Sequence, residues 1–154
     1  MTSLVDRPVK SDPDIFETEH RLRQGNYMRG ESRNLRNLLE DDLALVVSLD
    51  LQMDFIVTEL ERLYREGLRA YGDPIIVNGK YEVEVREDRG KTPCPWGDRF
   101  FAPKTVVSAR NLENGTILKY SLLGLHMIKR HGFFQGAQSP FRIEPSLLKK
   151  FFDL

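Results

Sequence analysis

The stretch GDPIIVNGKYEVEV, residues 72–85, marks the point where the chain changes from one type of secondary structure to another. Gly72-Asp73-Pro74 stops a helix, because proline cannot continue one and restricts the residue before it. Three β-branched residues and Asn78-Gly79 follow, and then apolar and charged side chains alternate from Tyr81 to Val85. Asn-Gly supplies the positive φ angles of a type I′ turn, so this stretch predicts a β-hairpin.

Beyond this hairpin, the strand-like alternation of side chains with a period of two residues occurs once more. Residues 105–110 and 116–120 predict a second hairpin, with its turn at 111–115. Capping and turn residues then predict three more short elements. These are a helix from Ser121 to Gly132, a strand near Phe141–Ile143 and a last helix opened by Pro145.

The chain before residue 72 has helical spacing. Residues 1–11 are polar and without periodicity, which is typical of a loose arm. Asp12-Pro13-Asp14 predicts a helix start, because aspartate caps and proline suits the first turn. This helix is expected to run to Gln24, with Gly25 as the residue that ends it.

Two periods compete between residues 31 and 66, where there is neither glycine nor proline. A 3-4 spacing of apolar residues, broken at Asp42, favours a helix, which we expect over about residues 49–71. A strict alternation also runs through residues 43–57, so residues 43–48 could be strand instead. Helices first and hairpins after predict an α+β fold, with a long helix packed on an antiparallel sheet and short C-terminal helices.

Composition bounds the class of protein. With 154 residues, 40% hydrophobic and 30% charged, the chain is expected to form one α+β domain, residues 1–154. The single cysteine permits no internal disulfide, and no apolar run is long enough to cross a membrane. We therefore expect a soluble cytoplasmic protein with no membrane partner. Residues 1–73 carry an excess of acidic side chains and residues 74–154 an equal excess of basic ones.

The helix expected near residues 49–71 also predicts self-association. It would be about 35 Å long at about 1.5 Å per residue, longer than one small domain readily covers. Its apolar stripe contains Met53, Ile56, Leu60 and Leu63. A second copy could cover the rest of this stripe, and a homodimer is the commonest symmetric solution.

Two of the three histidines, His126 and His131, lie in LLGLHMIKRHGFFQG, residues 122–136. They are five residues apart, about 140° around a helix, whereas two ligands of one metal on one helix are usually four apart. His131 precedes Gly132, so its imidazolium would meet the negative end of the helix dipole. The sequence favours structural roles for both, and we assign no catalytic residue, metal or cofactor.

The loop GKTPCPWGDRFFAP, residues 90–103, is the strongest candidate for a binding surface. It joins the two hairpins and is long for such a connection, which favours a function. Trp96, Arg99 and Phe100 are side chains of the kind that anchor interfaces. We expect this loop to contact an unidentified protein or small molecule.

An enzyme is the first alternative. Cys94 and Asp98 of the loop could approach His126 and His131 and form a thiol or metal-dependent site, with Trp96 as its cover. The usual paired metal-ligand spacings and glycine-rich phosphate loops are absent, so the sequence does not favour this convergence. A Cys94 more than about 12 Å from both histidines would exclude direct chemistry, since hydrogen bonds span about 3 Å.

Nucleic-acid binding is the second alternative. Arg130 with Phe133 and Phe134 interleaves positive charge and aromatic rings in the basic half, as stacking and phosphate contacts require. The zero net charge does not favour it. The function expected first is a non-catalytic binding or regulatory module that self-associates.

Overall fold

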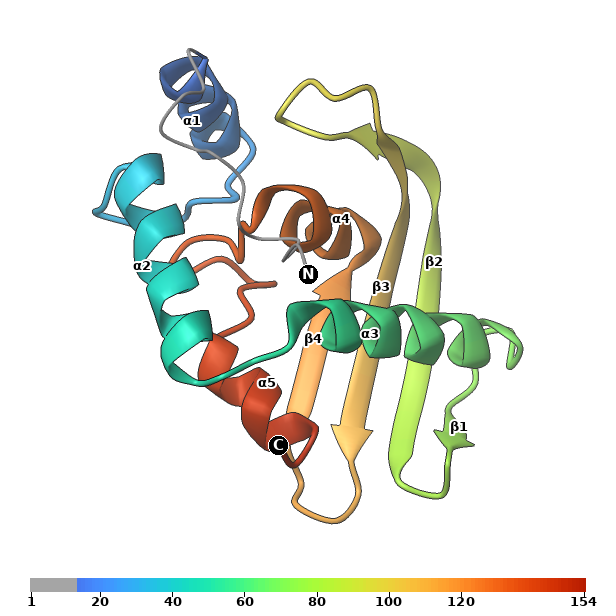
Figure 1. Ribbon diagram of the computed structural model, residues 1–154. Helices are drawn as coiled ribbons and strands as arrows, with labels where there is room; N and C mark the ends of the chain where they lie inside the picture. Colours follow the sequence, from blue (N-terminus) through green and yellow to red (C-terminus); the bar gives the residue numbers. More distant parts are fainter. Residues whose placement is uncertain (1–13) are drawn as a thin grey trace.

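The computed structural model describes residues 14–154, and Figure 1 shows its five helices and four strands. The arm expected over residues 1–11 and the helix start at Asp12-Pro13 lie outside these residues. The fold is α+β, as predicted: three helices come first, then an antiparallel sheet, then two short helices.

The N-terminal helices are α1 (Ile15–Gln24), α2 (Leu35–Ser48) and α3 (Met53–Leu68). Gly25 caps α1, as expected, and the Asn34 side chain caps α2 by accepting a hydrogen bond from the Asn37 N–H. Residues 43–48 belong to α2, so they are helix and not strand. The helix expected over 49–71 is shorter at both ends, because α3 begins at Met53 and ends at Leu68. Asp50, with a positive φ of 55°, separates α3 from α2.

The sheet is a meander of β1 (Ile75–Val77), β2 (Tyr81–Pro93), β3 (Phe101–Asn111) and β4 (Ile117–Ser121). The strands lie in sequence order and every neighbouring pair is antiparallel. Both predicted hairpins are present, and the first turn has the expected positive φ angles, 54° at Asn78 and 64° at Gly79. The alternation predicted only the first part of β2, which continues past an irregularity between Glu87 and Lys91 to pair with β3 again.

Two short helices, α4 (Leu122–His131) and α5 (Pro145–Phe151), complete the fold as predicted. The strand expected near Phe141–Ile143 is absent: these residues form a turn and an irregular segment. The Arg142 N–H donates to the Ser139 carbonyl in a turn and pairs with no strand, and the Arg142 guanidinium is hydrogen-bonded to Asp42 of α2 and to the Gln135 carbonyl.

The main core lies between α3 and the sheet. Figure 1 shows α3 crossing the strands on one face, and its apolar stripe packs there with Val83, Val107 and Tyr120. The stripe comprises Met53, Ile56, Leu60 and Leu63, all at most 3% exposed. The reason for expecting a homodimer through this helix is therefore removed, since the same chain covers the stripe. The oligomeric state itself stays a prediction.

A second apolar cluster packs α1 and α2 against α4 and the start of β3. Helix α4 belongs to both clusters: Leu125 and Ile128 face the main core, whereas Leu123 and Met127 face the second cluster. The end of α4 is thereby held beside the loop that joins β2 to β3. No helix within residues 14–154 is both long and apolar enough to cross a bilayer.

Candidate metal site

The loop of residues 94–100 is closed by its own hydrogen bonds. The Cys94 N–H donates to the Phe100 carbonyl at 2.8 Å, and the Gly97 N–H donates to the Cys94 carbonyl at 3.0 Å. The Asp98 carboxylate accepts from the Phe100 N–H at 3.1 Å through Oδ1. Gly97 and Arg99 both have positive φ angles, 75° and 65°. These bonds hold Cys94 and Asp98 in fixed positions within a tight turn.

Local sequence also fixes the end of α4. Ser121 caps its start by accepting from the Gly124 N–H. Gly132 ends the helix in the left-handed conformation, φ 65°, and its N–H bonds back to the Ile128 carbonyl. His131 is therefore the last helical residue, as predicted, and its side chain lies at the end of α4 where the loop passes.

The four residues converge. Oδ2 of Asp98 lies 2.8 Å from Nε2 of His126 and 2.8 Å from Nε2 of His131. The Cys94 Sγ lies 3.7 Å from the same nitrogen of His131. One ligand atom from each of the four side chains lies within 4.8 Å of all the others. The convergence that the sequence did not favour is thus present, because Asp98 inserts between two imidazoles that leave the helix in different directions.

Aromatic rings enclose the histidines. Trp96 stacks on His131 with ring centroids 4.3 Å apart and planes 4° apart, as the cover hypothesis anticipated. Phe100 stacks in the same way on His126 at 3.8 Å and 6°. Trp96 in turn packs edge-on against Phe133. The stacks limit rotation of both imidazoles, so Nε2 of each points at the carboxylate.

Burial and hydrogen bonds set the charges of the site. Burial alone would raise the pKa of Asp98, but hydrogen bonds from the two imidazoles and the Phe100 N–H outweigh it and hold that pKa well below its usual range. Burial lowers the pKa of His131, and Asp98 offsets this only in part. Burial also raises the pKa of the Cys94 thiol to about 12. The metal-free site at neutral pH is a carboxylate between imidazoles, beside a protonated thiol that is a poor nucleophile.

The donor set has the ligand types of a tetrahedral zinc site, and its spacings of up to 4.8 Å would contract on binding. Zinc bonds of about 2.0–2.1 Å to nitrogen or oxygen and about 2.3 Å to sulfur place neighbouring ligand atoms about 3.3–3.6 Å apart. The 3.7 Å from Cys94 Sγ to His131 Nε2 is close to this spacing. The Asp98 oxygen, at 2.8 Å from each imidazole, would withdraw by about 0.5 Å to reach it. Metal binding would replace the two hydrogen bonds and deprotonate the thiol.

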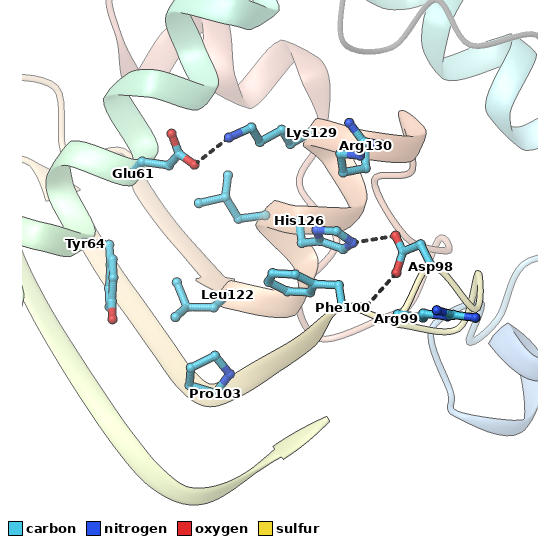
Figure 2. A pocket seen from close by; sticks show the side chains of 11 residues that line it. Glu61, Tyr64, Asp98, Arg99, Phe100, Pro103, Leu122, His126, Lys129 and Arg130 are labelled. Carbon is cyan, nitrogen blue, oxygen red and sulfur yellow. Dashed lines mark hydrogen bonds and ion pairs between the residues drawn. The ribbon is translucent and has the colours of Figure 1, made fainter. Parts of the chain in front are cut away.

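A cavity of about 490 Å³ opens beside the cluster. Figure 2 shows that its lining residues come from α3, from α4, from the loop before β3 and from the start of β3. Asp98 and His126 form part of its wall, whereas Cys94 and His131 do not. The full lining is Glu61, Tyr64, Asp98, Arg99, Phe100, Pro103, Leu122, Leu125, His126, Lys129 and Arg130.

Helix α1 supports the site in a way that the sequence did not indicate. Arg21 Nε donates to the Pro95 carbonyl at 2.6 Å, across 74 residues of chain. Tyr27 and Trp96 both pack against the cluster that contains Cys94. An arginine on a predicted amphipathic helix is an ordinary surface residue, so the sequence around Arg21 did not predict its contact with Pro95.

The remaining predicted binding residues divide into two groups. Arg99 and Arg130 are exposed at the cavity, and Phe100 contributes its ring to the same wall. Phe133 and Phe134 are at most 1% exposed and belong to the core. They are unavailable for stacking on bases, so the aromatic half of the nucleic-acid hypothesis is wrong for these two residues.

Comparison of the chain with protein-family models, curated proteins and solved structures found no match.

Proposed function

We propose that the protein binds a transition-metal ion, in the first place zinc, through Cys94, Asp98, His126 and His131. The observation that carries the proposal is the convergence of four donor atoms within 4.8 Å of one another. A thiolate, two imidazoles and a carboxylate are all zinc ligands, whereas calcium and magnesium take oxygen ligands. The thiol disfavours manganese in the same way.

The proposed metal would join the loop of residues 94–100 to the end of α4. Cys94 and His131 lie away from the cavity, so they would be the enclosed ligands. Asp98 is the most exposed side chain of the four, at 23%, and it faces the cavity. Catalytic zinc sites keep three protein ligands and one exchangeable position. We infer that Asp98 holds this fourth position and is the ligand that water or a substrate would displace. The metal-dependent alternative is therefore the better hypothesis.

The hypothesis of a non-catalytic binding module that uses residues 90–103 has less support. The rings of Trp96 and Phe100, expected as anchors, are stacked on the two histidines. It stays a prediction, as does self-association. A reducing compartment such as the cytoplasm would keep Cys94, a free thiol, available to a metal.

Metal analysis of the purified full chain tests the proposal. We expect about one zinc per chain by mass spectrometry of the elements, and cobalt in its place should give the absorption of a cobalt–thiolate bond. Cys94→Ser and His131→Gln should each weaken zinc binding by at least about tenfold, since each loses a direct ligand. Cys94→Ser should also abolish the cobalt–thiolate absorption.

His20→Gln is the matched control, because His20 is the third histidine and lies exposed on α1, outside the cluster. It should bind zinc like the unmodified chain. Circular dichroism establishes that each variant is folded. A folded, unmodified chain that takes up no zinc or cobalt at micromolar free metal would overturn the proposal, and so would a Cys94→Ser variant with unchanged affinity.

A further inference from the structure

The lining of the cavity beside the cluster combines apolar and charged side chains, and the Glu61–Lys129 pair lies on a different side of it from Asp98 and Arg99 (Figure 2). Phe100, Pro103, Leu122 and Leu125 supply apolar surface, and Figure 2 shows Leu122 and Pro103 on the opposite side of the cavity from Asp98 and Arg99. Its volume of about 490 Å³ lies within the usual range for small-molecule sites, about 300–1,000 Å³. A ligand that fills it would therefore need an apolar body.

The charges of the cavity are unequally compensated. Lys129 is paired with Glu61 at 3.2 Å, and Asp98 accepts hydrogen bonds from the two imidazoles. Arg99 and Arg130 also line the cavity, and within residues 14–154 neither of them forms an ion pair. Two guanidinium groups without an ion-pair partner and the Asp98 carboxylate thus remain at the cavity, which leaves one net positive charge in its lining. Guanidinium groups bind carboxylates and phosphates with two parallel hydrogen bonds.

We propose that this cavity binds a small organic anion, a phosphate ester or a carboxylate whose apolar body packs on Phe100 and Leu122. Arg99 and Arg130 hold the anionic group. The inference goes beyond the metal proposal and does not require the ion, because the apolar surface and both arginines belong to the metal-free chain. A bound zinc would add net positive charge at Asp98 and His126, and anion binding would then be tighter.

Phenyl phosphate is a suitable probe, because it combines an aromatic ring with a dianion. Titration calorimetry at low salt should show saturable binding of one molecule per chain, in both the metal-free and the zinc-loaded protein. Arg99→Gln and Arg130→Gln should each weaken binding by about tenfold, the usual effect of losing a hydrogen bond between charged groups. Arg89→Gln is the matched control, since Arg89 lies exposed on β2 and outside the cavity.

Three other probes separate the contribution of the aromatic ring, the contribution of the charge and the preference for one type of anion. Phenol carries the ring alone and inorganic phosphate the charge alone, so both should bind much more weakly than phenyl phosphate. Benzoate distinguishes the two anion sources: equal affinity indicates organic anions in general, and weaker binding indicates a phosphate ester. Both results support the site.

The inference fails if the folded chain does not bind phenyl phosphate in either metal state, or if the double variant Arg99→Gln/Arg130→Gln binds it like the unmodified chain. This failure is distinct from that of the metal proposal. Zinc binding without phenyl phosphate binding would refute only the proposed anion site. The opposite result would refute only the proposed metal site: the chain takes up no metal, but it binds phenyl phosphate and this binding depends on both arginines.

Discussion

At the scale of single residues, the contact between Trp96 and His131 offers a direct optical report on the site. Trp96 is the only tryptophan of the chain, and its ring lies 4.3 Å from that of His131. A protonated imidazole quenches tryptophan fluorescence at such a distance, whereas a neutral one quenches it less. Since burial lowers the pKa of His131, the imidazole should stay neutral below its ordinary value of about 6.5.

We therefore expect the fluorescence of the metal-free protein to fall on acidification with a midpoint below pH 6.5. His131→Gln should remove this transition, and His20→Gln should leave it unchanged. A midpoint above 6.5 would mean that the contact with Asp98, not burial, dominates His131. It would also contradict the charge state described for the site.

The same residues show what the sequence could and could not predict about the site. The sequence predicted the position of His131 at a helix end and the loop that carries Cys94 and Asp98, and it identified these side chains as possible ligands. Their convergence was not, because a carboxylate from a loop 28 residues away fills the gap between two imidazoles five positions apart on a helix. The i, i+4 rule applies to ligands that reach a metal from one helix alone.

At the scale of elements, the packing of α3 on the sheet depends on a close approach at Gly67. A Cβ at this position would lie 2.7 Å from Val85 Cγ2 and 2.8 Å from Val83 Cγ1. Both valines are at most 2% exposed, and β-branched side chains have little rotamer freedom to move aside. The helix therefore lies closer to β2 than any side chain at residue 67 would permit.

Gly67→Ala should lower the free energy of unfolding by about 1 kcal/mol, measured by urea denaturation. Overpacking costs about 1–3 kcal/mol and the gain in helix propensity is about 1 kcal/mol, so the net loss is at most about 2 kcal/mol. Adding Val85→Ala should cost less in the Gly67→Ala background than in the unmodified chain, because it removes one of the two clashing methyls. A Gly67→Ala variant more stable than the unmodified chain would refute the close approach.

Element types were predictable wherever a turn or cap had a local signature. Asn78-Gly79 defined one hairpin, Ser121 and Gly132 bounded α4, and Pro145 opened α5. The ambiguous residues 43–48 are helix, and from this helix Val46 is buried in the main core and Leu43 packs against it, a contact between distant segments. Local alternation carries no information about that packing.

At the scale of the whole molecule, a buried ion pair connects α2 to the segment that leads into α5. Asp42 of α2 and Arg142 are 100 residues apart and form two hydrogen bonds, of 2.6 and 2.9 Å. Their side chains are 5% and 8% exposed. The sequence showed Asp42 only as an interruption of an apolar stripe. A buried charge needs a partner, but nothing local to Asp42 indicates which of the basic residues provides it.

Asp42→Asn should destabilise the fold by about 3 kcal/mol, measured by urea denaturation, because it leaves the Arg142 guanidinium buried without its main counter-charge. The loss should lie at the lower end of the usual range of about 3–5 kcal/mol, since Arg142 keeps Glu144 and the Gln135 carbonyl as partners.

The neighbouring Asp41→Asn is the matched control. Asp41 is 58% exposed and pairs with Arg33 at the surface, so its loss should cost less than about 1 kcal/mol. The double variant Asp42→Leu/Arg142→Met should be more stable than Asp42→Asn alone, because it removes both charges and fills their volume with apolar atoms. If Asp42→Asn and Asp41→Asn destabilise the protein equally, the pair does not hold α2 to the C-terminal segment, and the apolar contacts between them must suffice.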